Sequence, residues 1–314
     1  MFQGMEYVYE IYKEGSFSKA AKKLYVSQPS LSATVKRIEK KVGYPIFDRS
    51  KKPLELTECG ERYIKTVEQI MSAKTEFANF LNDWGDLKLG KLAIGGGSLF
   101  LAYALPSLIK EFGRKFPGIQ VELVEESTGR LEEFLQNGRL DFVLDNNSMD
   151  EELFDRLALK EEHLLLAVPK SFAVNDRLES YQIPADTIRK GTYLDESVKA
   201  VPLKEFEEEP FILLKQENDT RERAMMICKE NRFSPNIVFE LDQQMTSYNI
   251  TTSGMGISFI SDTLIARMPA NPNVVYYKLK GKNTKRNIYF YWKRGRYVSR
   301  PMEEFLRIVM KKYA

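Results

Sequence analysis

One stretch near the start of the chain combines short polar side chains with cations, a combination suited to contacting nucleic acid. Apolar residues recur in it at helical spacing, at Leu31, Val35, Ile38 and Val42. This spacing predicts a helix from about residue 29 to residue 41 with one face packed on a core. On the outward face, short side chains let the backbone approach base edges, while lysine and arginine reach phosphates. The same residues are also typical of the solvent-exposed face of a three-helix bundle that binds nothing.

We predict that DNA contacts come from this helix, from the turn before it and from a basic hairpin after it. Ser18 is suited to cap the second helix, and Ser27 or Gln28 the third, with Pro29 in its first turn. Two short strands near residues 46–49 and 54–57 enclose a basic tip, as in a wing. The residues expected to contact DNA are Ser18, Ser27, Gln28, Pro29, Ser30, Ser32, Ala33, Thr34, Lys36, Arg37, Arg49, Lys51 and Lys52.

The chain is poor in the residues that most catalytic and metal sites need. It has one histidine, His163, and two cysteines, Cys59 and Cys228, far apart in sequence. Serine-protease-like or multi-histidine metal chemistry would depend on His163 alone, which precedes an apolar run and is read as the start of a strand. No P-loop and no glycine-rich dinucleotide motif is present. We therefore expect no enzyme, no bound metal and no cofactor.

Length and charge fit a soluble protein with several domains. At 314 residues the chain has room for two or three domains. Residues 1–60 hold eleven lysines and arginines against seven aspartates and glutamates, whereas the remainder holds 36 against 37. The positive excess lies where a polyanion would be met. No signal peptide and no apolar run of about 18 residues is present, so we expect a cytoplasmic protein without membrane contact.

A single long helix is predicted from residue 59 to about residue 84. Its apolar stripe is too long for one small domain, so a second copy of the helix is its expected partner. The residues expected at this dimer contact are Ile64, Val67, Ile70, Met71, Phe77 and Leu81.

Strands and helices alternate after residue 89. The order strand, helix, strand, helix, strand up to residue 144 implies a parallel sheet. A second set of strands starts near residue 164, and the final strands, 274–278 and 288–292, are expected to return to the first lobe. Two crossings between two lobes would form a hinged cleft, as in periplasmic solute-binding proteins.

The N-terminal sixty residues resemble the LysR-type transcriptional regulators. The matching string is Gly15-Ser16-Phe17, Ala20-Ala21, Leu24, Val26-Ser27-Gln28-Pro29-Ser30-Leu31-Ser32, Ile38-Glu39, Gly43, Ile46-Phe47, Arg49, Leu56-Thr57 and Gly60. Later positions such as Leu105-Pro106 and Gly254-Met255-Gly256-Ile257 agree more loosely with the family's sensor domain. Ala33 departs from the family, which often has arginine there, so Arg37 is expected to carry more of the DNA contact.

Effector residues are expected beyond the carboxyl ends of the strands, where open α/β sheets bind ligands. This rule, together with the resemblance at Ser98, Thr128 and Gln216, selects six polar residues, and Met245 is added as a candidate for the wall of the cleft. The set is Ser98, Thr128, Asn146, Gln216, Asn218, Thr220 and Met245. Because Ser98 begins a predicted helix, a small anion is expected there. Each of these polar residues alone is also typical of a helix cap or a turn. Met245 is also typical of a residue packed in a hydrophobic core.

The predicted architecture is an α plus α/β protein in three parts. Residues 1–58 form a winged helix-turn-helix, 59–88 a linker helix, and 89–314 an effector domain with lobe I at about 89–163 and 265–314 and lobe II at about 164–264. Its expected partners are a dyad site on double-stranded DNA, a second copy in a homodimer or homotetramer, a small effector, and RNA polymerase. The alternatives are a solute-binding component, an enzyme that uses the cleft, and a regulator that answers a protein partner.

Overall fold

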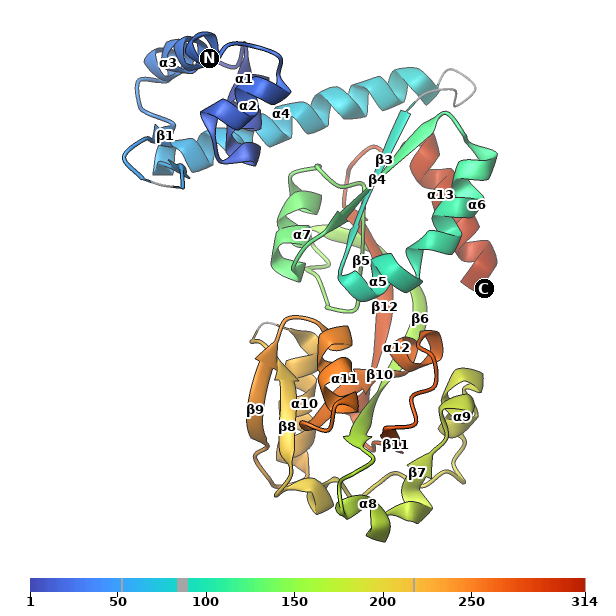
Figure 1. Ribbon diagram of the computed structural model, residues 1–314. Helices are drawn as coiled ribbons and strands as arrows, with labels where there is room; N and C mark the ends of the chain where they lie inside the picture. Colours follow the sequence, from blue (N-terminus) through green and yellow to red (C-terminus); the bar gives the residue numbers. More distant parts are fainter. Residues whose placement is uncertain (52, 84–89, 217, 314) are drawn as a thin grey trace. The chain divides into compact units, whose positions relative to one another are not determined.

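A computed structural model describes residues 1–51, 53–83, 90–216 and 218–313 of the chain (Figure 1). It separates into two compact units, one built mainly from residues 1–86 and the other from the α/β region after them. None of the described helices combines the length and the apolar character needed to cross a bilayer.

The first unit is a winged helix-turn-helix with a long helix attached. Its elements are α1 (Met5–Glu14), α2 (Phe17–Lys23), α3 (Gln28–Val42), β1 (Phe47–Asp48), β2 (Glu55–Leu56) and α4 (Glu58–Asp83). α3 begins as predicted, because the Ser27 hydroxyl accepts a hydrogen bond from the Ser30 N–H at 3.3 Å. The predicted cap of α2 was wrong by two residues, since Ser16 accepts from the Lys19 N–H and Ser18 lies exposed inside the helix.

The inward faces of these helices follow the predicted spacing. Leu31, Val35 and Ile38 are at most 2% exposed and belong to one core with α1, α2 and α4. The wing strands pair antiparallel, with Phe47 opposite Leu56. Gly60 N–H donates to the Thr57 hydroxyl at 2.9 Å, so Thr57 caps α4.

The first turns of α4 complete this core, which corrects part of the dimer prediction. Ile64 and Val67 are buried in the monomer, and Ile70 and Met71 pack against the same cluster. Three short helices cannot bury enough apolar surface alone, so α4 supplies the missing wall. Farther along α4, Phe77, Phe80 and Leu81 stay exposed.

Lobe I of the second unit contains the predicted parallel sheet. Its elements are β3 (Gly90–Gly96), α5 (Ser98–Tyr103), α6 (Leu105–Lys115), β4 (Ile119–Glu125), α7 (Thr128–Gln136), β5 (Phe142–Asp145) and, from the chain's end, α13 (Arg300–Tyr313). β3 pairs in parallel with both β4 and β5. Two helices, and not the single one expected between the first two strands, connect β3 to β4, because Pro106 stands in the first turn of α6 and has no N–H to continue α5.

Lobe II is built around a second group of strands. Its elements are α8 (Val174–Arg177), β7 (Gln182–Ile183), α9 (Ala185–Lys190), β8 (Pro210–Leu214), α10 (Asp219–Glu230), β9 (Asn236–Leu241), α11 (Gln244–Thr252), β10 (Ile257–Ser261), α12 (Asp262–Arg267) and β11 (Val274–Lys278). The expectation that residues 274–278 return to lobe I was wrong. β11 pairs antiparallel with Leu165–Pro169 and with β7, because Tyr277 buries completely in the core of lobe II.

Two long strands join the lobes. β6 (Phe154–Pro169) pairs along its first part with β12 (Lys285–Lys293) and along its last part with β10 and β11. β12 also pairs with β5 of lobe I. Figure 1 shows both strands running between the lobes, as the prediction of two crossings requires.

Candidate functional site

The outward face of α3 carries polar and basic side chains. Ser27, Gln28, Pro29, Ser30, Ala33, Lys36 and Arg37 are exposed, and Ser32 and Thr34 are half-buried. Lys36 and Arg37 form no ion pair with any residue that the structure describes. A helix whose first turn is exposed and free of charge, with cations behind it, can approach a polyanion end first.

The wing is attached to α3 through Arg49. The Arg49 guanidinium lies 3.2 Å from the Glu39 carboxylate, donates to the Ser32 hydroxyl at 3.3 Å and stacks over the Phe17 ring. Lys51 pairs with Glu55 across the wing at 2.5 Å, and Lys52 lies outside the described residues. Arg49 therefore holds the wing in place and keeps 37% of its side chain exposed.

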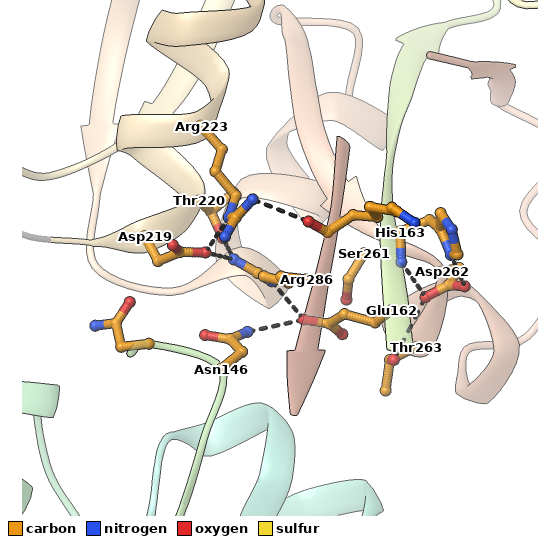
Figure 2. A network of polar contacts seen from close by, with 12 residues as sticks. Asn146, Glu162, His163, Asp219, Thr220, Arg223, Ser261, Asp262, Thr263 and Arg286 are labelled. Atoms are coloured by element: carbon orange, nitrogen blue, oxygen red, sulfur yellow. Dashed lines mark hydrogen bonds and ion pairs between the residues drawn. The ribbon is translucent and has the colours of Figure 1, made fainter. Parts of the chain in front are cut away.

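A second candidate site is a polar network where the lobes meet, centred on Arg286 of β12 (Figure 2). The Arg286 Nε donates to Glu162 Oε1 at 2.7 Å, and its Nη1 donates to Asp219 Oδ2 at 2.5 Å. The side chains of Arg286 and Glu162 are 1% and 0% exposed. Asn146 of lobe I donates to the same Glu162 oxygen at 2.8 Å, so the network joins both lobes through the crossing strands.

The network continues into lobe I through a buried carboxyl group. Asp145, at the end of β5, accepts from the Thr128 hydroxyl at 3.0 Å and from the backbone N–H groups of Asn146 and Asn147. Burial raises the pKa of Asp145 above its usual value, although these three hydrogen bonds act in the opposite direction. Two of the predicted effector residues, Thr128 and Asn146, are thereby connected.

In lobe II the network includes the start of α10 and of α11. Thr220 accepts from Arg286 Nη1 at 3.0 Å and from the Gln244 amide at 2.7 Å. The Ser98 hydroxyl of lobe I donates to Gln243, the residue that caps α11, at 2.5 Å. Ser98 and Thr220, predicted from different lobes, therefore bind neighbouring residues at the start of α11.

The remaining predicted effector residues have other surroundings. Asn218 caps α10 by accepting from the Thr220 N–H at 2.9 Å. Gln216 is exposed and lines a groove of about 890 Å³ along the outer side of α10, with Met225 and Met226. Met245 is half-buried on α11. The structure thus brings Ser98, Thr128, Asn146 and Thr220 to the network and leaves Gln216 outside it.

Sequence reasoning missed the two charges at the centre. Arg286 shares the buried side of β12 with Ile288 and Phe290, and Glu162 is buried two residues before Leu164 on β6. Alternation along each strand was therefore a usable signal, since a charge at an inward position of a strand needs a partner. Burial would lower the pKa of Arg286, but Glu162 and Asp219 raise it above its usual value.

The single histidine lies beside the network, as Figure 2 shows. The His163 backbone N–H donates to Asp262 at 3.1 Å, and the Tyr193 hydroxyl donates to the other oxygen of that carboxylate at 2.8 Å. Burial would raise the pKa of Asp262, yet hydrogen bonds from His163 and Tyr193 hold it below its usual value. The Asp262 carboxylate therefore joins His163 of β6 to Tyr193.

Two family models match the chain. The model described as "LysR substrate binding domain" matches residues 85–314, and the one described as "Bacterial regulatory helix-turn-helix protein, lysR family" matches residues 2–61. An uncharacterized HTH-type transcriptional regulator, YcgK of Bacillus subtilis, is 30% identical over 97% of this chain and 92% of its own length. A probable RuBisCO transcriptional regulator of Nostoc is 28% identical over 96% of this chain and 85% of its own.

Solved structures agree in fold. The crystal structure of CbnR, a LysR family transcriptional regulator, matches with a TM-score of 0.69 at 16% identity, covering 100% of this chain and 99% of CbnR. The structure of full-length CbnR with its target DNA matches with a TM-score of 0.68 at 17% identity, covering 99% of each chain.

Proposed function

Because the chain belongs to the LysR family of bacterial transcriptional regulators, we propose that its α3 face binds DNA and that its lobes bind the effector. Family membership makes the chain a DNA-binding regulator with a C-terminal effector domain and not an enzyme. The observation that carries the assignment to α3 is its exposed first turn, followed by Lys36 and Arg37 without ion-pair partners among the described residues. DNA lies in the cytoplasm, where we propose that this regulator acts.

Two copies of the chain are needed for a dyad site. The exposed Phe77, Phe80 and Leu81 on α4 give each copy an apolar surface that a second α4 would cover. Paired copies would place two α3 helices on successive major grooves, about 34 Å apart. Further association of effector domains would give a tetramer.

The effector is proposed to bind at the polar network between the lobes. Nη2 of Arg286 has no acceptor and Oε2 of Glu162 has no donor among the described residues, although both atoms are buried. Buried polar atoms of this kind favour a ligand that supplies what they lack. Such a ligand is neutral overall and has an acceptor oxygen and a donor group, as amides, polyols and zwitterionic amino acids do.

A bare anion, expected from the sequence, is less well supported by these surroundings. α5 has only six residues, and the Ser98 hydroxyl is already bonded to Gln243. The Arg286 charge is balanced by Glu162 and Asp219. An added negative charge would therefore lack a counter-charge in a buried place, which is costly.

A ligand screen tests this proposal. Thermal unfolding of the full chain is followed with a panel of bare carboxylates, neutral amides and zwitterionic amino acids, matched as propionate, propionamide and alanine are. We expect stabilising compounds to come from the last two classes, to shift DNA affinity, and to lose their effect with Thr220→Val. Stabilisation by bare carboxylates alone, or hits that Thr220→Val leaves unchanged, would contradict the proposed site.

A further inference from the structure

Tyr25 closes the turn between α2 and α3 in a backbone conformation that tyrosine rarely adopts. Its φ is 55°, and Arg232 is the only other non-glycine residue with positive φ among those described. Val26 N–H donates to Ala21 O at 3.1 Å, and Tyr25 N–H donates to Lys22 O at 3.3 Å. These two bonds form the helix-ending motif whose left-handed position is usually glycine. Tyrosine there disfavours folding by about tenfold relative to glycine.

The Tyr25 side chain does not offset this strain within the domain. It is 96% exposed, the highest value among the exposed large apolar side chains of the described residues. No hydrogen bond, ring stacking or cation contact joins it to another described residue. Strained positions that contribute nothing to packing are typical of binding sites, where the side chain is needed for an outside partner.

The position of Tyr25 indicates which partner that is. It stands two residues before Ser27, the N-cap of α3, and the exposed Gln28, Pro29 and Ser30 follow directly. A group at this end of α3 lies at the edge of any groove that the helix enters. Tyrosine hydroxyls commonly donate to phosphate oxygens, and such contacts fix the register of a protein on DNA.

We propose that Tyr25 is a DNA-positioning residue whose hydroxyl donates to a backbone phosphate beside the groove that α3 enters. This inference rests on the proposed DNA-binding face of α3. The contact is uncharged, so it adds affinity without releasing a counterion. It orders the turn before α3 on the DNA and does not select a base.

The test compares Tyr25→Phe and Tyr25→Gly with the natural chain. Fluorescence anisotropy measures affinity for a duplex carrying a selected site, and for a scrambled duplex, at several salt concentrations. We expect Tyr25→Phe to weaken binding to both duplexes by about tenfold while the salt slope stays unchanged. Tyr25→Gly should weaken binding at least as much, yet be more resistant to urea than the natural chain, because the backbone strain is relieved.

Several results would overturn the inference. Unchanged affinity in both variants would remove Tyr25 from the interface, and lost affinity in Tyr25→Gly together with lower resistance to urea would make its role structural. Normal DNA affinity with impaired transcription would assign Tyr25 to a protein partner such as RNA polymerase. Lys36→Ala serves as the reference: if it weakens binding and Tyr25→Phe does not, the inference fails while the α3 face stands. If neither weakens binding, the proposed face itself fails.

Discussion

Arg286 and Glu162 are 124 residues apart in sequence, yet the Arg286 Nε donates to Glu162 Oε1 at 2.7 Å in a place that solvent does not reach. Each residue lies on one of the two strands that cross between the lobes. Asn146 of lobe I and Asp219 of lobe II bind the two ends of this pair. The pair therefore links groups of both lobes on the two strands that join them.

Removing Arg286 should destabilise the effector domain strongly. Arg286→Met leaves Glu162 as an uncompensated buried charge, and we expect a loss of about 3–5 kcal/mol in the free energy of unfolding. The double variant Arg286→Met with Glu162→Gln should recover much of that loss, as measured by urea unfolding. Arg294→Met is the matched control, since its pair with Asp155 is exposed and should contribute under about 1 kcal/mol. A double variant as unstable as the single one would refute this account of the pair.

The buried carboxyl of Asp145 should make stability depend on pH. Because its pKa is higher in the folded than in the unfolded protein, the folded state binds more protons. Its contribution to stability is therefore greatest at low pH and falls as pH rises from the usual value of 3.8 through the raised folded value. Asp145→Asn removes this dependence, so the variant should gain stability relative to the natural chain across that window.

Urea unfolding from about pH 4 to about pH 7 measures the effect of Asp145→Asn. Asp262→Asn is the contrasting variant, because burial would raise the pKa of Asp262 but hydrogen bonds from His163 and Tyr193 hold it below its usual value. Its contribution to stability is therefore present above that value, and its loss should destabilise throughout. Parallel pH curves for Asp145→Asn and the natural chain would show that Asp145 is not responsible.

The later turns of α4 should control assembly. Phe77→Ser with Leu81→Ser removes exposed apolar surface from the proposed interface. We therefore expect a weaker dimer, which dissociates at higher protein concentrations than the natural dimer, while the winged helix remains folded. Val67→Ala should instead lower the stability of the monomer, by about 1–3 kcal/mol, because Val67 is fully buried. Sedimentation velocity and urea unfolding separate the two effects. A dimer unaffected by the double variant would place the interface elsewhere.

Lys36 and Arg37 of α3 should each contribute one phosphate contact. Lys36→Ala and Arg37→Ala are each expected to weaken binding to all DNA sequences and to lower the slope of log affinity against log salt by about one. Lys23→Ala is the control, since Lys23 is already paired with Glu10 and Glu14 on α1. If Arg37→Ala alters preference at one base pair and leaves the slope unchanged, Arg37 reads a base instead.

The sequence was informative where local patterns decide the structure. Leu31, Val35 and Ile38 define the inner face of α3, and Ser27 and Gly43 mark its ends, because each signal lies within one helix. Ser16 and Ser18 are equally good caps by residue type, so the choice between them depended on where Phe17 packs. Local patterns therefore predicted elements more reliably than their exact ends.

Features set by long-range packing could not be predicted in the same way. The pairing of Arg286 with Glu162 depends on the register of β12 against β6, which includes an irregularity between Ile288 and Tyr289. The prediction assigned the β11 residues to lobe I and not to lobe II, because their apolar pattern fits a strand of either sheet. Likewise Ile64 and Val67 belong to an apolar stripe that a partner helix or the monomer's own core could bury.

Selection of genomic fragments tests the central claim most directly. The purified full chain is mixed with fragmented DNA of its source organism at near-physiological salt, with and without a metabolite extract, and the bound fragments are sequenced. We predict enrichment of a few sites near promoters, each with two half-sites about one helical turn apart, and loss of that enrichment with Gln28→Ala combined with Arg37→Ala. Uniform or absent enrichment under both conditions, from a protein shown to be folded, would contradict the assignment of α3 as the DNA-reading face.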